Sequence, residues 1–237
     1  MKMIANIPVV SPDWRDMPWV MAFTTVAKDG DTVFDFSSSA RNGYRKILKR
    51  ALPVDELFWL KMDHSAIVSK APDRDRPPFD AVIITKKQTA AAITTADCLP
   101  IIITDKRTCC VALIHAGWRG IADGIIENCI EMLDFKSFYS VRAWIGPSVR
   151  DDYEIGPDVK EKILAGGNVS EQAFTPGNGD KYFADLCFIA QSKMKFCGIL
   201  EENIEVYPGS TIGDKRFFSV RREGAGAGRM ATVAAIV

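Results

Sequence analysis

The chain has 237 residues, of which 47% are hydrophobic and 25% charged, and its 30 basic and 30 acidic residues give a formal net charge of zero. This composition is typical of a globular protein, and the charge balance argues against general attraction to nucleic acid or to an anionic membrane. No apolar run approaches the roughly 18 residues of a membrane span, and the first residues lack the apolar core of a secretory signal. We therefore expect a cytoplasmic protein.

Short β-branched and apolar runs predict buried strands. They cover residues 19–26, 58–62, 81–85, 91–95, 101–104, 110–114, 141–145 and 204–207. Apolar residues spaced three or four apart predict helices with one buried face. These helices cover residues 42–52, 118–133 and 184–197, with a shorter one around 158–164. Breaks such as 72–78 are too short for an interdomain linker. We expect a single α/β (α+β) domain over residues 1–237, with mixed sheets flanked by helices.

The chain contains only two histidines, His64 and His115, and each follows an apolar segment. Cys98 likewise lies between two apolar segments, shortly before Pro100. Because each of these side chains is expected at the end of a strand, the three could meet at one edge of a sheet. Two imidazoles and a thiolate are a complete ligand set for a catalytic zinc, which keeps its fourth position open. The residues therefore indicate a candidate metal site.

Further candidates surround these ligands. His115 is expected where a strand gives way to a helix, and the free N–H groups of a helix start favour an anion. Arg119 adds more donors there, so we expect it to position phosphate or an oxyanion. Asp80 and Asp97 are candidates for orienting a ligand or for acid–base chemistry, and Cys98 and His115 are candidates for catalysis.

Each residue also has a plainer interpretation. A lone histidine at a strand end usually has an ordinary hydrogen-bond partner, and a lone cysteine is usually a small buried hydrophobe. Trp118 fits a core position. Asp123 and Glu127 lie four residues apart and predict a solvated helix face, with Asp123 orienting a ligand as the alternative. The six cysteines include no CxxC pair, which argues against a structural zinc knuckle.

At these residues the sequence resembles the YfiH-type family, also labelled laccase-domain or multicopper polyphenol oxidase proteins. The matching strings are Ala96-Asp97-Cys98-Leu99-Pro100, His115-Ala116-Gly117-Trp118-Arg119-Gly120 and Ile145-Gly146-Pro147-Ser148, with support from 80–85, 153–156 and 217–224. The resemblance covers about residue 57 to the end. It implies a layered α/β domain and a metal, usually zinc, held by His64, Cys98 and His115, with copper as the older alternative.

The resemblance also implies an activity on purine nucleosides. The family is associated with phosphorolysis of adenosine, inosine and guanosine, so the implied partners are a small nucleoside and phosphate. Adenosine deamination and, under the older label, copper-dependent phenol oxidation are the other activities. The chain departs from the family pattern around the ligands. Met62-Asp63-His64-Ser65 replaces Gln-Val-His-Gly, Thr24-Thr25-Val26 lacks the usual arginine and glycines, and Ser210-Thr211 replaces Cys-Thr.

The residues favour zinc over a multicopper centre, which needs about ten histidines for its copper ions. In a phosphorylase, Arg119 and either Arg222 or Arg229 could hold phosphate. In a deaminase, a zinc-activated water would attack the purine, although the H-x-E…P-C-x-x-C signature is absent. Two further hypotheses remain. Cys98 and His115 could form a metal-free pair in a deamidase-like hydrolase, or the chain could bind nucleosides without turnover.

Overall fold

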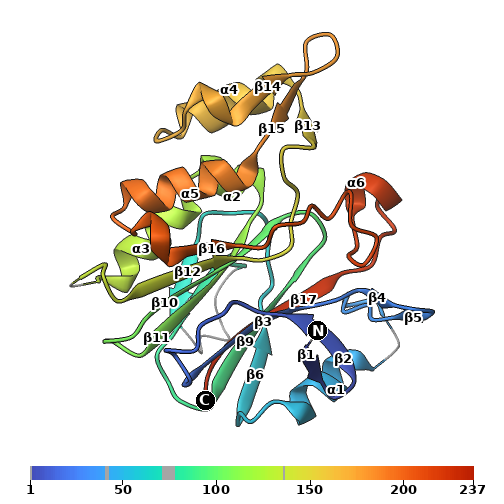
Figure 1. Cartoon of the computed structure of the whole chain (residues 1–237), viewed down its shortest axis with the longest axis vertical. Coiled ribbons are helices and arrows are strands. Elements are labelled where there is room, and N and C mark those ends of the chain that lie inside the picture. Colours follow the sequence, from blue (N-terminus) through green and yellow to red (C-terminus); the bar gives the residue numbers. More distant parts are fainter. Residues whose placement is uncertain (1, 41–42, 71–77, 136) are drawn as a thin grey trace.

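The computed structural model describes residues 2–40, 43–70, 78–135 and 137–237. Two six-stranded sheets pack face to face, and helices cover their outer faces (Figure 1). This arrangement confirms the predicted α/β class with mixed sheets flanked by helices. The predicted break at 72–78 lies outside the described residues except for Pro78, and so does residue 42 of the first predicted helix.

The first sheet contains the strands β1 (Lys2–Ile4), β2 (Ile7–Val10), β3 (Val20–Thr25), β17 (Met230–Ile236), β9 (Thr89–Thr95) and β6 (Glu56–Trp59), in that order. Only the pair β6 and β9 is parallel; the other neighbours are antiparallel. On the outer face, Leu48 of helix α1 (Tyr44–Ala51) packs with Ala90 and Ala92 of β9. Small side chains on this strand allow the helix to approach the sheet closely.

The second sheet contains β16 (Ile204–Val206), β12 (Val141–Ile145), β10 (Leu99–Asp105), β11 (Cys110–Ala116), β8 (Ala81–Ile84) and β7 (Val68–Lys70), in that order. Helices α3 (Ile125–Leu133) and α5 (Leu186–Phe196) cover its outer face, where Ile126 and Ile189 pack in the same cluster as Ile101 and Ile103. The other face of β10 and its neighbours turns toward the first sheet.

The core between the sheets contains Ile93 of β9 together with Ile102, Leu113 and Trp144 from the second sheet. Both faces of these strands are therefore buried. Strands buried on both faces read as continuous apolar runs instead of alternating ones, which explains why runs such as 81–85 and 110–114 predict strands correctly.

Smaller elements complete the structure. The three-stranded sheet has the order β13 (Tyr153–Ile155), β15 (Tyr182–Ala184) and β14 (Phe174–Pro176), and β4 (Lys28–Asp29) pairs with β5 (Thr32–Val33). The remaining helices are α2 (Trp118–Ala122), α4 (Pro157–Ala165), α6 (Val220–Glu223) and the 3₁₀ turns η1 (Glu171–Ala173) and η2 (Glu201–Asn203). Among the described residues, no helix is long and apolar enough to cross a membrane.

The structure corrects two expectations for residues 118–133. The helix expected over 118–133 is two helices, α2 and α3, because Gly124 between them adopts a left-handed φ of 88°. Glu127 does not lie on a solvated face, since its carboxylate accepts a 2.6 Å hydrogen bond from the buried Lys193 ammonium. Asp123 does face solvent, where it pairs with Lys162.

Candidate metal centre

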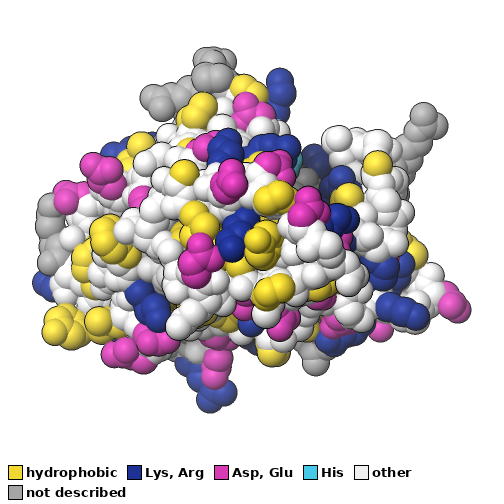
Figure 2. All heavy atoms as spheres, turned by 90° about the horizontal axis from the view of Figure 1, so that it is seen from above, with side chains coloured by type: hydrophobic (Ala, Val, Ile, Leu, Met, Phe, Trp, Pro, Cys, Tyr) yellow, Lys and Arg dark blue, Asp and Glu magenta, His cyan; other side chains and the backbone are white. Residues whose placement is uncertain are grey.

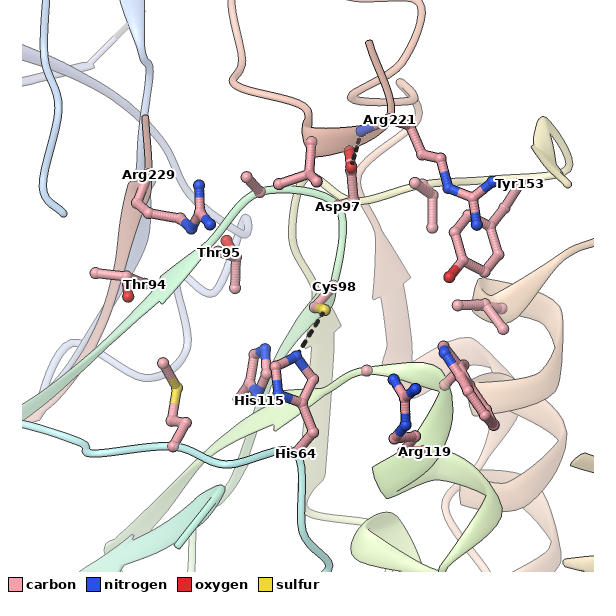
Figure 3. Close-up of a pocket in the computed structure, with 17 residues that line it drawn as sticks. His64, Thr94, Thr95, Asp97, Cys98, His115, Arg119, Tyr153, Arg221 and Arg229 are labelled. Carbon is pink, nitrogen blue, oxygen red and sulfur yellow. Dashed lines mark hydrogen bonds between the residues drawn. The ribbon is translucent and has the colours of Figure 1, made fainter. Parts of the chain in front are cut away.

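Three chain segments bring the candidate ligands together. Cys98 lies in the connection from β9 to β10, where the chain passes from the first sheet to the second. His115 lies near the end of β11, opposite Pro100 of β10. His64 lies between β6 and β7. One ligand atom from each of the three side chains lies within 4.8 Å of the others (Figure 3). The structure thus brings the side chains of His64, Cys98 and His115 together, as expected.

The spacing of these atoms suits a small divalent ion. In a tetrahedral zinc site with bonds of about 2.0–2.3 Å, neighbouring ligand atoms are about 3.3–3.8 Å apart. The Cys98 Sγ atom is 4.0 Å from Nε2 of His64, and no pair of the three ligand atoms is more than 4.8 Å apart. Contractions of at most about 1–1.5 Å would therefore form such a site. The sulfur and both imidazoles leave one tetrahedral position for water or substrate.

Asp80 organises both histidines from a fully buried position immediately before β8. Its Oδ1 atom lies 2.7 Å from Nδ1 of His115, which leaves Nε2 of that ring for a metal. The same carboxylate accepts hydrogen bonds from the backbone N–H groups of His64 and Ser65, at 3.1 and 2.9 Å. His64 has a left-handed φ of 65°, which is uncommon for a residue with a side chain. These hydrogen bonds hold the segment in that conformation.

The charges of the three groups are coupled. Burial raises the pKa of the Cys98 thiol, but hydrogen bonds and positive charge from His115 and His64 outweigh burial and lower it to about 6. Burial lowers the pKa of His115, but the hydrogen bonds to Asp80 and Cys98 outweigh it and raise the pKa to about 9. Hydrogen bonds from His115 and the backbone outweigh burial and hold the pKa of Asp80 well below its usual range. The site therefore favours a thiolate, which is the form that binds metals.

Gly117 leaves room for two of the ligands. A Cβ atom on this residue would lie 3.1 Å from Cδ2 of His64 and 3.2 Å from Sγ of Cys98. Both distances are tighter than ordinary van der Waals contact, so the ligands would have to shift by a few tenths of an ångström. The absence of a side chain at Gly117 allows the chain to turn from β11 into α2 beside the site.

The ligands open into a pocket of about 380 Å³, a size typical of small-molecule sites. Arg119, Arg221 and Arg229 line it, and they come from three separate segments: α2, α6 and the residue before β17 (Figure 3). The Arg119 guanidinium lies 4.4 Å from the Trp118 ring centre, and that of Arg221 lies 4.3 Å from the Tyr153 ring centre. Figure 2 shows histidine at the edge of a recess, with Lys and Arg side chains beside it. The pocket is thus suited to an anionic ligand.

Two of the sequence candidates have other contacts. The Asp97 carboxylate accepts hydrogen bonds from the Thr211 hydroxyl at 2.7 Å and from the backbone N–H of Arg221 at 2.8 Å. It therefore fixes the C-terminal segment beside the pocket and, among the described residues, makes no hydrogen bond to a candidate ligand. The Arg222 guanidinium donates to the backbone carbonyls of Thr211 and Phe217. It does not line the pocket, so the expectation that Arg222 could hold phosphate does not fit the structure.

Sequence reasoning missed Arg221, which lines the pocket in place of its neighbour. Both arginines belong to the short helix α6, and the direction of each side chain depends on how that helix sits against the pocket. Tyr153 and Thr95 were also missed as lining residues. The only sequence signal near Arg221 is the matching string 217–224. Nothing in that string indicates which of its two arginines, Arg221 or Arg222, faces the pocket.

Fold and site together define a class: a two-sheet α/β protein with a His/Cys/His candidate metal centre in an arginine-lined pocket. Residues 29–237 match the family model described as multi-copper polyphenol oxidoreductase laccase. The chain belongs to this family, the YfiH-type family that its motifs resemble.

Similar proteins cover nearly the whole chain. A purine nucleoside phosphorylase of Haemophilus influenzae is 30% identical over 244 residues, covering 94% of this chain and 97% of that protein. A purine nucleoside phosphorylase of Pseudomonas aeruginosa is 31% identical, covering 90% and 92%. The crystal structure of the hypothetical protein YfiH of Bacillus licheniformis has a TM-score of 0.87 at 22% identity, covering 99% and 98%. This last similarity supports the fold.

Proposed function

We propose that the chain is a purine nucleoside phosphorylase that uses a zinc ion held by His64, Cys98 and His115. The observation that carries this proposal is the meeting of these three side chains in one pocket with three arginines. Near full-length relatives that are named purine nucleoside phosphorylase support the reaction. The substrates would be a purine nucleoside and phosphate.

The donor set supports zinc over a multicopper centre. The chain has two histidines, whereas a multicopper centre needs about ten. Copper remains the alternative metal, because two histidines and one cysteine also form single-copper sites. Zinc bound here would supply a Lewis acid that polarises an oxygen or nitrogen of the substrate.

In phosphorolysis, a phosphate oxygen forms a bond to C1′ of the ribose while the bond from C1′ to the purine nitrogen breaks. The electron pair of the broken bond goes to the purine, which takes up the proton lost by hydrogenphosphate. The chain must hold phosphate close to C1′ and stabilise the charges that develop. Arg119 would hold an anion or offset negative charge, since its guanidinium lines the pocket. Asp80 would act as a positioning residue for both histidines.

One alternative has its own structural support. The Cys98 thiol interacts with His115, and the shifts in their pKa values favour a thiolate beside an imidazolium in the metal-free protein. Such a pair is the arrangement of nucleophile and acid–base partner in cysteine hydrolases. The deamidase-like hypothesis therefore stands beside the zinc enzyme and predicts full activity without a metal.

The deciding experiment combines elemental analysis with product analysis. Purified protein is given inosine or adenosine, with and without phosphate, after removal of metal and after addition of zinc or copper. Free purine and ribose 1-phosphate, formed only with phosphate and zinc, would support the proposal. Inosine formed from adenosine without phosphate would indicate a deaminase, and binding without turnover would indicate a binding protein. Phenol oxidation that requires copper would support the older family label.

A further inference from the structure

The hydroxyl of Thr95 is buried without a partner. Thr95 ends β9, lines the pocket and is 1% exposed, and its Oγ1 atom makes no hydrogen bond within the described part of the chain. Neighbouring buried threonines are satisfied: Thr24 and Thr232 share a 2.7 Å hydrogen bond, and Thr25 accepts one from a backbone N–H. Because buried polar groups nearly always have partners, the Thr95 hydroxyl needs a partner that the described protein atoms do not supply, namely a water or a ligand group in the pocket.

Arg229 is held beside this hydroxyl by the first sheet. It immediately precedes β17, whose first residue, Met230, lies opposite Thr95 in the strand pairing. Its Nη1 atom donates to the backbone carbonyls of Ala227 and Gly228. Figure 3 shows its guanidinium and the Thr95 side chain on the same side of the pocket, away from Arg119.

The Arg229 guanidinium forms no ion pair with an acidic residue in the described part of the chain, whereas Arg216 and Arg222 pair with Asp214 and Glu223. The Asp35 carboxylate lies nearby, but it accepts the backbone N–H of Arg229, at 2.9 Å. A guanidinium that is fixed at a pocket wall without an ion-pair partner is suited to a phosphate group, because the phosphate oxygens can accept hydrogen bonds from several of its N–H groups. The hydroxyl of Thr95 can donate to the same group.

We propose that Thr95 and Arg229 form the binding site for the phosphate group of the substrate, on the wall of the pocket opposite Arg119. This inference deepens the proposed function and rests on it for the identity of the phosphate. The phosphate group is that of inorganic phosphate or of a nucleoside monophosphate, since both present the same oxygens. If the site binds inorganic phosphate, Arg119 contacts the purine side of the nucleoside instead of the phosphate.

The test uses Thr95→Val, which removes the hydroxyl and keeps the shape of the side chain, and the pair Arg229→Met and Arg229→Lys. Ser69→Ala is the matched control, because Ser69 carries another buried hydroxyl without a partner but does not line the pocket. Binding of inorganic phosphate and of inosine monophosphate is measured directly by calorimetry. The KM for phosphate and the KM for inosine are measured separately.

Loss of a hydrogen bond to a charged group predicts a rise of about tenfold in the KM and Kd for phosphate in Thr95→Val. Arg229→Met should have a larger effect and Arg229→Lys should recover part of it. The KM for inosine should stay within about twofold of wild type in the Thr95 and Arg229 variants. In Ser69→Ala, both KM values and the Kd for phosphate should also stay within about twofold of wild type. If inosine monophosphate, and not inorganic phosphate, loses affinity in the variants, the site binds a nucleotide.

An unchanged affinity for both phosphate compounds in Thr95→Val would overturn the inference, because the hydroxyl would then contact only a buried water. Equal changes in both KM values would also overturn it, as they indicate a structural effect. If the wild-type protein forms no ribose 1-phosphate, the proposed function fails, while the calorimetric comparison still tests the phosphate site. Folding of each variant is checked by its thermal unfolding, and Arg229→Lys preserves the test if Arg229→Met does not fold.

Discussion

The Asp80 carboxylate lies 2.7 Å from Nδ1 of His115 and also accepts the backbone N–H of His64. One side chain thus sets the ring orientation of one candidate ligand and the backbone conformation of another. Contacts of this kind orient metal ligands, and their loss typically costs about 10–100-fold in metal affinity or activity.

We therefore expect Asp80→Asn to lower zinc affinity by about 10–100-fold, as measured by competition with a chelator of known affinity. The amide loses the negative charge beside His115, and its NH2 group replaces the Oδ2 atom that accepts hydrogen bonds from the backbone N–H groups of Asp63 and Ser65. Asp63→Asn is the control, since Asp63 is an exposed acidic neighbour and the change in charge is the same. Equal zinc affinity in wild type and Asp80→Asn would contradict this role for Asp80.

A methyl group at Gly117 should weaken the metal site. Gly117→Ala would press on His64 and Cys98, and ligand displacements of a few tenths of an ångström matter because zinc bonds have well-defined lengths. We expect lower zinc affinity with little change in secondary structure by circular dichroism. Gly226→Ala is the control, because a Cβ atom there would meet nothing within 4 Å. Retention of wild-type zinc affinity in Gly117→Ala would show that the ligands can move aside.

The reactivity of Cys98 in the metal-free protein should depend on pH. Its pKa is lowered to about 6, so the thiolate is present above about pH 6 and is lost as the pH falls below that value. Because the thiolate is the reactive form, the rate of alkylation should rise through an inflection near pH 6 and reach a plateau by pH 7–8. Mass spectrometry of the Cys98 peptide separates this reaction from that of the exposed Cys109.

Zinc should protect Cys98 from the same reagent and leave Cys109 reactive. Alkylation of Cys98 at equal rates with and without zinc would contradict its assignment as a metal ligand. A Cys98 rate that continues to rise above pH 8 would instead show that the two histidines do not lower its pKa in solution.

The buried ammonium of Lys193 predicts a large effect on stability. Its Nζ atom contacts Glu127 at 2.6 Å and the backbone carbonyls of Gly166 and Gly167 at 3.2 and 3.0 Å. Removing one partner of a buried ion pair leaves the other charge without compensation, so Lys193→Met should lower the free energy of unfolding by about 3–5 kcal/mol. Denaturant titration measures this change.

Lys195→Met is the matched control, because Lys195 lies on the same helix as Lys193 and forms an exposed ion pair with Glu201 of η2. Exposed ion pairs contribute little, so its unfolding free energy should stay close to that of the wild type. If Lys193→Met and Lys195→Met unfold at the same denaturant concentration, the buried pair does not stabilise α5 against α3.

The fold class could be predicted because most strands of the second sheet are buried on both faces and read as apolar runs. The strand β17 could not be predicted in the same way. Its sequence, Met-Ala-Thr-Val-Ala-Ala-Ile, is rich in alanine, which favours helices. What makes it a strand is its position between β3 and β9, whose residues are distant in the sequence.

The candidate site was predictable to a similar degree. The two histidines and Cys98 could be placed at element ends from the apolar runs alone, and the structure brings them together. Asp80 could be named as a partner but not distinguished from Asp97, because only strand pairing places Asp80 beside His115. The choice of Arg221 and Arg229 over Arg222 depends on side-chain directions that no spacing in the sequence specifies.

The position of β17 has a consequence for synthesis of the protein on the ribosome. The strands β3 and β9 are made early and pair with β2 and β6, yet each lacks its second neighbour, β17, until residues 230–236 emerge. Nascent chains therefore carry two open strand edges that can pair with other chains, and aggregation is the expected failure during overexpression. All three candidate metal ligands precede this strand, whereas Arg229 arrives with it, so the pocket acquires its last arginine only when the first sheet closes.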